Sequence, residues 1–239
     1  MSRKTTGIFF DFGTTLFDYY PSNSIVWSRI AKRLGFEISP DDPRIREGMR
    51  RQDVGFVRLG IPESKLTRED IHNLNCQVLS VMGIDGDITG IIEIIDEEFD
   101  RIFLTGEGFQ MFPDSKETLE RIHSMGIPIG MISNCPTRFC EPRRRIMKEH
   151  GIFDFFGAII LSGEVGLRKP GKKIFEIALK ELGIAEAKNA MHVGDSVMMD
   201  VQGAQNAGLV PVLFDARDLH SVDNVIKIRK LPEIFQYLK

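Results

Sequence analysis

The sequence is poor in the features that would mark a secreted, membrane or nucleic-acid-binding protein. It has three cysteines in 239 residues, and this odd number argues against a disulfide framework and favours reduced thiols. Its formal net charge of -3 gives no field that would recruit nucleic acid. It lacks an apolar run long enough to cross a bilayer, and its first residues lack the apolar segment of a signal peptide. We therefore expect a cytoplasmic protein with no nucleic-acid and no membrane partner.

What is present is an ordinary globular composition, with 42% hydrophobic and 27% charged residues. Short apolar runs alternate with helical patterns along much of the chain. The run 7–10 predicts a buried strand that ends at Asp11. Further strands are predicted at 127–132, 158–161, 190–193 and 209–214, and helices at 115–125, through 145–150, at 171–182 and at 198–207. Strands separated by helices predict a doubly wound α/β fold, with a parallel sheet and helices on both faces.

Between Pro21 and about Gly106 the pattern changes, because helical spacing continues there without a convincing strand. We expect an α/β core domain of residues 1–18 and 107–239, interrupted by a helical cap domain of residues 19–106. An insertion after the first strand would lie over the carboxyl ends of the strands, where such sheets bind ligands. The insertion is therefore a candidate lid.

The residues at the strand ends carry the functional signal. Asp11 ends the first strand, Ser133 and Asn134 end the second, Lys169 follows the third, and the fourth ends at Asp195 with Asp200 beyond it. In a parallel sheet these positions meet at one edge. Carboxylate oxygens are the ligands that Mg²⁺ prefers, while a hydroxyl and an ammonium group hold phosphate oxygens. The set therefore predicts phosphoryl transfer with Mg²⁺ as the cofactor.

The same residues, in this order, resemble the haloacid dehalogenase superfamily, in the branch with a helical cap inserted after the first motif. Four motifs support the resemblance, and the last is the most distinctive. They are Asp11-x-x-x-Thr15-Leu16, Ile132-Ser133-Asn134, Lys169-Pro170, and Gly194-Asp195-Ser196 with Asp200-x-x-Gly203-Ala204.

The resemblance implies a role for each matching position. Asp11 would be the nucleophile that forms an aspartyl-phosphate, and Lys169 would stabilise charge. Ser133 would donate a hydrogen bond to the phosphate, next to Asn134 in the substrate-binding set. The metal ligands would be Asp11, Asp195, the backbone carbonyl of Gly13, and Asp200, the last either directly or through water. The expected substrate is a small phosphorylated metabolite, and the oligomeric state is left open.

The sequence departs from the family pattern at Gly13. Most phosphatases of the superfamily carry a second Asp there, which protonates the leaving oxygen and then deprotonates the attacking water. A positioned acid/base is worth about 10²–10⁴-fold in rate. Its absence implies slow turnover of alkyl phosphates, a substrate with a good leaving group, or a substitute acid from elsewhere.

Three alternatives remain open at this point. A 2-haloacid dehalogenase would share the nucleophile and the Ser-Asn pair, but would lack the metal-binding Asp195. A phosphonoacetaldehyde hydrolase would need a cap lysine as a Schiff base, and the insertion offers Lys32 and Lys65. A non-enzymatic binding module on a decayed hydrolase core would explain Gly13, but not the four site residues that remain.

Two further features have structural interpretations. His192 precedes Asp195 inside a predicted buried strand, so we expect a hydrogen-bonded core histidine. A basic cluster on one helix is expected to be a solvated helix face; it comprises Arg138, Arg143, Arg144, Arg145 and Lys148.

Overall fold

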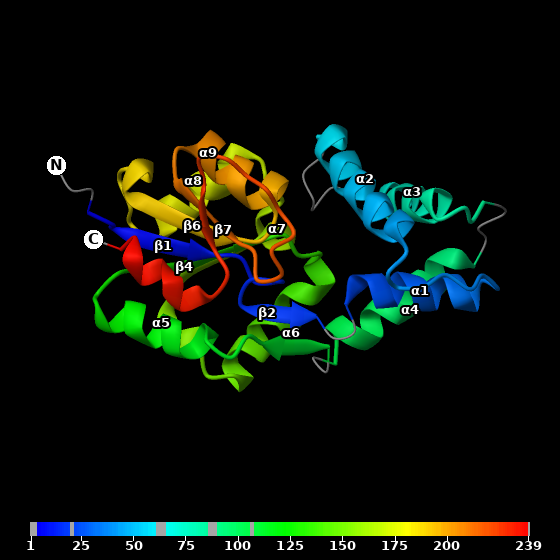
Figure 1. Ribbon diagram of the computed structural model, residues 1–239, viewed down its shortest axis with the longest axis horizontal. Coiled ribbons are helices and arrows are strands. Elements are labelled where there is room, and N and C mark those ends of the chain that lie inside the picture. The colour runs from blue at the N-terminus through cyan, green and yellow to red at the C-terminus, as the bar shows by residue number, and fades with distance from the viewer. Residues whose placement is uncertain (1–3, 20–21, 61–65, 86–89, 106–107, 239) are drawn as a thin grey trace. The chain divides into compact units, whose positions relative to one another are not determined.

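The computed structural model describes residues 4–19, 22–60, 66–85, 90–105 and 108–238 (Figure 1). Lys65 and the expected bounds of the insertion, Pro21 and Gly106, lie outside these ranges. The chain forms two compact units, one of residues Met1–Asp18 and Gln110–Lys239 and the other of residues Tyr19–Phe109. The core domain of residues 1–18 and 107–239 and the cap domain of residues 19–106, expected from the sequence, stay a prediction.

The first unit is built on a six-stranded parallel sheet with the strand order β5-β4-β1-β6-β7-β8. Its strands are β1 (Gly7–Phe10), β4 (Ile129–Ser133), β5 (Phe156–Leu161), β6 (Ala190–Gly194), β7 (Val210–Phe214) and β8 (Ile226–Ile228). β1, β4 and β6 are buried along their whole length, which explains why they appear in the sequence as unbroken apolar runs. The predicted doubly wound α/β fold is confirmed.

Helices cover both faces of this sheet, with α5 (Ser115–Ser124) and α6 (Thr137–Glu149) on one side and α8 (Lys172–Glu181) and α9 (Gly203–Ala207) on the other (Figure 1). A single turn, α7 (Ser162–Val165), follows β5. The helix expected at 198–207 is instead a π-helix at Val197–Gln202 that continues into α9. Apolar side chains of α8 and α9, including Ile174, Phe175 and Ala204, pack on Phe9 of the central strand and form the core of that face.

The second unit is helical, as expected from its spacing. Its four helices within the described ranges are α1 (Asn23–Arg33), α2 (Pro43–Leu59), α3 (Arg68–Val81) and α4 (Ile91–Phe103). Asp42 caps α2, and a capping box formed by Thr67 and Asp70 begins α3. α2 and α3 pack closely because Gly48 has no side chain, and a Cβ there would lie 3.0 Å from the Val78 Cα. Trp27 is buried in the core that all four helices share.

A short two-stranded sheet, β2 (Phe17–Tyr19) with β3 (Phe109–Met111), contains both points at which the chain passes between the units. These two strands were not predicted from the sequence. Within the described residues, no helix is long and apolar enough to cross a membrane. Cys135 and Cys140 are buried, and the Cys140 thiol donates to the Cys135 sulfur at 3.8 Å.

Candidate active site

The site forms at the carboxyl ends of three neighbouring strands, β4, β1 and β6, in the middle of the sheet. Ser133 is the last residue of β4, and Asp11 and Asp195 directly follow β1 and β6. Since all three strands run parallel, their ends lie at the same edge. The segments that carry the predicted site residues therefore meet in space.

Lys169 is the central cation of this edge. Its side chain is 2% exposed, and its Nζ donates to Asp11 Oδ1 at 2.8 Å and to Asp200 Oδ1 at 2.5 Å. Burial would lower the pKa of Lys169, but the charges of the two carboxylates outweigh burial and raise it, so the ammonium group stays charged. Asn134 fixes the backbone of this residue from both sides, because its Nδ2 donates to the Lys169 carbonyl at 3.1 Å and its Oδ1 accepts from the Lys169 amide at 2.9 Å. The substrate contact expected of Asn134 stays a prediction.

Asp200 is buried and collects three donors. Besides Lys169, it accepts from His192 Nε2 at 2.8 Å and from the Ser196 amide at 3.0 Å. Burial alone would raise the pKa of Asp200, and Lys169 and His192 lower it, so the group is an anion. Gly194 makes room for it, since a Cβ there would lie only 2.1 Å from the Asp200 Cγ.

His192 is the buried core histidine that its position in the strand predicted. Burial lowers its pKa, against the opposing effect of the Asp200 carboxylate, so the ring is neutral and donates from Nε2. The ring meets Phe175 edge-on, with the centroids 5.1 Å apart. His192 therefore supports the orientation of Asp200 from inside the sheet.

Three carboxylates converge at this edge, and Lys169 pairs with two of them. Asp11, Asp195 and Asp200 each offer an oxygen, and these atoms all lie within 4.8 Å of one another. Burial, followed by the charges of Asp200 and Asp11, raises the pKa of Asp195 to about 8, although Thr14 and Lys169 act in the opposite direction. An oxygen-only set with unbalanced negative charge is the chemistry that a hard divalent cation requires. The residues present therefore fit a metal site.

The turn after β1 is strained at Thr14, next to Gly13. Thr14 has a φ of 53°, which is rare for a β-branched residue, and its Oγ1 donates to the Gly13 carbonyl at 2.7 Å. Strained residues of this kind gather at functional sites. That carbonyl is the predicted backbone metal ligand, and the metal contact stays a prediction.

A family model of haloacid dehalogenase-like hydrolases matches residues 5–208 of the chain. The chain belongs to the haloacid dehalogenase-like hydrolase family. The match runs from β1 through the helical insertion to the end of α9, and so includes every strand-end residue described above. The resemblance inferred from the four motifs is confirmed.

The relatives that this haloacid dehalogenase-like hydrolase resembles in sequence include phosphatases. A phosphoglycolate phosphatase of Yersinia pseudotuberculosis serotype I is 38% identical over 102 residues, which are 43% of this chain and 42% of that protein. A glyceraldehyde 3-phosphate phosphatase of Methanopyrus kandleri is 35% identical over 102 residues, 42% of each chain. The chain thus spans less than half the length of these relatives. In structure, the HAD-hydrolase YfnB of Bacillus subtilis bound to magnesium has a TM-score of 0.71 at 18% identity over 99% of both chains, which shows the shared fold.

Arg143 is a residue of this site that was not predicted from the sequence. We expected it on a solvated helix face, but it is 4% exposed, and its Nη1 donates to Ser133 Oγ at 2.9 Å. The expectation was wrong because the basic residues of α6 do not share one face. Arg143 lies three or four positions from Phe139, Cys140, Ile146 and Met147, all of them buried, and this helical spacing was the available signal. Its neighbour Arg144 pairs with Glu164 at 2.6 Å.

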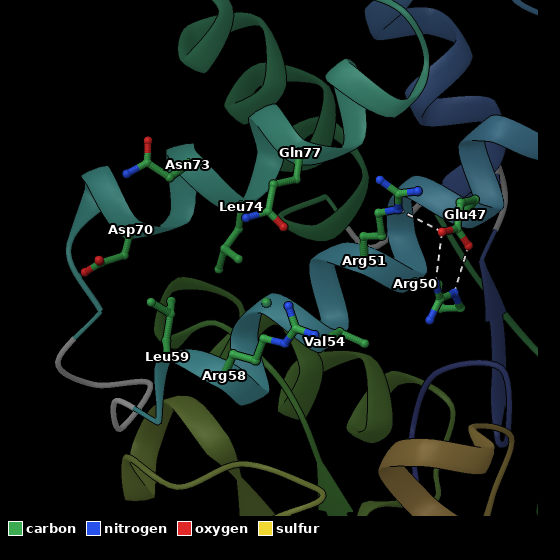
Figure 2. A pocket seen from close by; sticks show the side chains of 11 residues that line it. Glu47, Arg50, Arg51, Val54, Arg58, Leu59, Asp70, Asn73, Leu74 and Gln77 are labelled. Atoms are coloured by element: carbon green, nitrogen blue, oxygen red, sulfur yellow. Dashed lines mark hydrogen bonds and ion pairs between the residues drawn. The ribbon is translucent and has the colours of Figure 1, made fainter.

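Cavities of this hydrolase lie in both units. A small one of about 80 Å³ opens beside Asp195 and Thr14 and is bounded by the loop from Asp215 to His220. A larger one of about 660 Å³ lies between α2 and α3 and contains none of the predicted site residues (Figure 2). Figure 2 shows Arg50 and Arg51 of that cavity turned toward Glu47, which accepts hydrogen bonds from both.

Proposed function

We propose that this hydrolase is a Mg²⁺-dependent phosphatase that acts on a small phosphorylated metabolite through an aspartyl-phosphate on Asp11. One observation carries the proposal. The Lys169 ammonium group lies 2.8 Å from the Asp11 carboxylate inside a cluster of three acids, which is the charge arrangement that phosphoryl transfer needs. The proposal is supported by the phosphatases among its relatives and by the magnesium bound to the structurally similar Bacillus protein.

Asp11, Asp195 and Asp200 would hold the metal ion, together with the carbonyl of Gly13. Magnesium, when bound, supplies positive charge that offsets the carboxylates and the phosphate oxygens. The lysine supplies the second positive charge of the site. Because Asn134 holds its backbone and Asp200 its side chain, Lys169 keeps one orientation toward Asp11.

In the proposed cycle Asp11 attacks phosphorus, and the bond between phosphorus and the leaving oxygen breaks. Lys169 binds one oxygen of the Asp11 carboxylate and reduces the repulsion between the two reacting anions. Ser133 donates a hydrogen bond to a phosphate oxygen. Water then attacks the phosphorus of the aspartyl-phosphate, which releases inorganic phosphate and restores the carboxylate.

Gly13 narrows the proposed substrate class. Without an acid at this position, the leaving oxygen departs without a proton from that side chain. We therefore expect preference for phosphates whose leaving group is already a weak base, such as acyl or aryl phosphates. Thr14 and Thr15 do not replace the acid, because a hydroxyl is far weaker as a proton donor.

A phosphate-release screen tests this function. Purified protein is incubated with acyl, aryl and alkyl phosphates, each with Mg²⁺ and with EDTA, beside the Asp11→Asn variant. We expect release that requires Mg²⁺ and is lost in the variant. The control is Asp154→Asn, since Asp154 is an exposed acid of the same unit. Activity that survives both chelation and the loss of Asp11 would contradict the proposal.

The same preparation separates the alternatives. Halide release from 2-haloacids without metal would indicate a dehalogenase, and absence of turnover on every substrate would favour a binding module. The Schiff-base alternative already finds no support at Lys32, because this lysine is exposed and pairs with Glu37 at 3.4 Å, whereas an activated lysine is desolvated. Borohydride trapping with phosphonoacetaldehyde tests it directly.

A further inference from the structure

Arg143 places a second cation beside the strand-end residues of the first unit. It lies on α6 and is 4% exposed, a degree of burial that is unfavourable for an ion unless specific contacts offset it. Its Nη1 donates to Ser133 Oγ at 2.9 Å and to the Asn134 carbonyl at 3.2 Å. Both acceptors belong to the segment that ends β4.

The guanidinium group also contacts the residue after the nucleophile. The Arg143 Cζ lies over the Phe12 ring, 4.5 Å from its centroid, and forms a cation–π contact. Arg143 therefore links the end of β4 to the end of β1. Its orientation is determined by contacts on both strand ends.

The hydrogen-bond chemistry of Arg143 determines what Ser133 is able to do. A guanidinium group stays protonated and only donates, so Ser133 Oγ must be the acceptor in this bond. A serine hydroxyl has one proton and two lone pairs. With one lone pair held by Arg143, the hydroxyl proton is directed to another partner, and a donated bond from a cation strengthens that proton as a donor. A phosphate oxygen is the acceptor that such a hydroxyl fits best.

We propose that Arg143 is a positioning residue that fixes Ser133 as a hydrogen-bond donor to the phosphate group of the substrate. This inference rests on the proposed phosphatase function. It assigns Arg143 an action through Ser133, and it distinguishes this arginine from Arg145 on the same helix, whose side chain is 49% exposed and lies 3.7 Å from Glu149.

A double-mutant cycle tests the proposal. We compare Arg143→Met, Ser133→Ala and the double variant by steady-state phosphate release, and by calorimetric binding of inorganic phosphate in the presence of Mg²⁺. Loss of one hydrogen bond to a charged group predicts about a 10- to 100-fold fall in kcat/KM for Ser133→Ala. Arg143→Met should cost about 10-fold in the wild-type background and less than about 3-fold in the Ser133→Ala background, because the arginine then has no hydroxyl to orient.

A purely structural role predicts a different result. Arg143→Met would then lower kcat/KM by the same factor in both backgrounds, and that outcome overturns the proposal. Arg143→Lys, which keeps a donor, should recover part of the activity and of the phosphate affinity. If Arg143→Met does not fold, Arg143→Lys in both backgrounds supplies the same comparison. Arg145→Met is the matched control and should equal wild type.

The experiment distinguishes a wrong phosphatase function from a wrong role for Arg143. A wild-type protein that neither releases nor binds phosphate would refute the proposed function and this inference with it. An active wild type with additive losses in the cycle would refute only the assignment of Arg143.

Discussion

Replacing Asp195 with asparagine is expected to stabilise the metal-free protein and to remove the proposed metal-dependent activity. The ligand oxygens of Asp11, Asp195 and Asp200 lie within 4.8 Å of one another. At an effective dielectric constant of about 20, two unit charges at that separation repel by about 3 kcal/mol. Asp195→Asn removes the repulsion with both neighbours. Because Lys169 already offsets part of it, we expect a net gain of about 1–3 kcal/mol in the free energy of unfolding.

The stabilising effect of Asp195→Asn is expected to increase with pH. The pKa of Asp195 is raised to about 8 in the folded protein, first by burial and then by the charges of Asp200 and Asp11. In an unfolded chain it would be about 3.9. Between these values the unfolded state binds fewer protons, so this carboxyl lowers stability increasingly as pH rises from about 4 to about 8. The gain from asparagine should therefore be smaller at pH 5 than at pH 8.

Thermal unfolding followed by circular dichroism checks the prediction at pH 5 and pH 8, in EDTA and in Mg²⁺. For a chain of this size 1 kcal/mol shifts Tm by about 2–4 °C, so we expect a rise of about 2–12 °C at pH 8 in EDTA. Mg²⁺ should raise Tm of the wild type and leave Asp195→Asn unchanged. Asp154→Asn serves as the control, with no change expected. A variant less stable than wild type at pH 8 in EDTA would refute the reasoning, as would a difference independent of pH.

Three further substitutions have defined outcomes. Gly13→Asp supplies the missing acid and should raise kcat on alkyl phosphates by about 10²-fold or more, while kcat on aryl phosphates changes little. An equal effect on both classes in steady-state assays would argue against the role assigned to this position. Gly194→Ala places a Cβ 2.1 Å from the Asp200 Cγ. The free energy of unfolding measured in urea should therefore fall by about 1–3 kcal/mol, and phosphate release should be reduced. Thr67→Ala removes the capping box of α3. The free energy of unfolding measured in urea should fall by about 1 kcal/mol, and kcat should stay unchanged. A change in kcat would contradict a purely local role.

The sheet was predictable from sequence because its central strands are buried on both faces. β1 has the predicted bounds, and β4, β5, β6 and β7 differ from theirs by one or two residues. β8 was missed, since three residues with Lys227 in the middle carry too little pattern to identify a strand. The π-helix at Val197–Gln202 was predicted as an ordinary helix because residue type does not distinguish the two hydrogen-bond spacings.

For the site, the strand topology predicted which residues lie near one another, but not how their side chains interact. Parallel strands bring their ends together, which was enough to group Asp11, Ser133 and Asp195. The interaction of Arg143 with Ser133 depends on how α6 is rotated against the sheet. The number of basic residues along the helix does not indicate this rotation. The spacing of the apolar residues around Arg143 does indicate it, because it places Arg143 on the buried face of the amphipathic helix.

The position of β1 has a consequence for how the chain is made. Ile8 pairs with Ile129 on one side and Met191 on the other, so its partners are synthesised 121 and 183 residues later. At 5–20 residues per second the second partner emerges about 10–40 s after β1. Until the first partner emerges, this apolar strand has both edges unpaired, and one edge stays unpaired until the second partner follows; unpaired edges allow strands of different chains to associate. The helical second unit, whose contacts are local in sequence, completes its fold first. Slower growth or a holdase chaperone during expression should therefore raise the yield of folded protein.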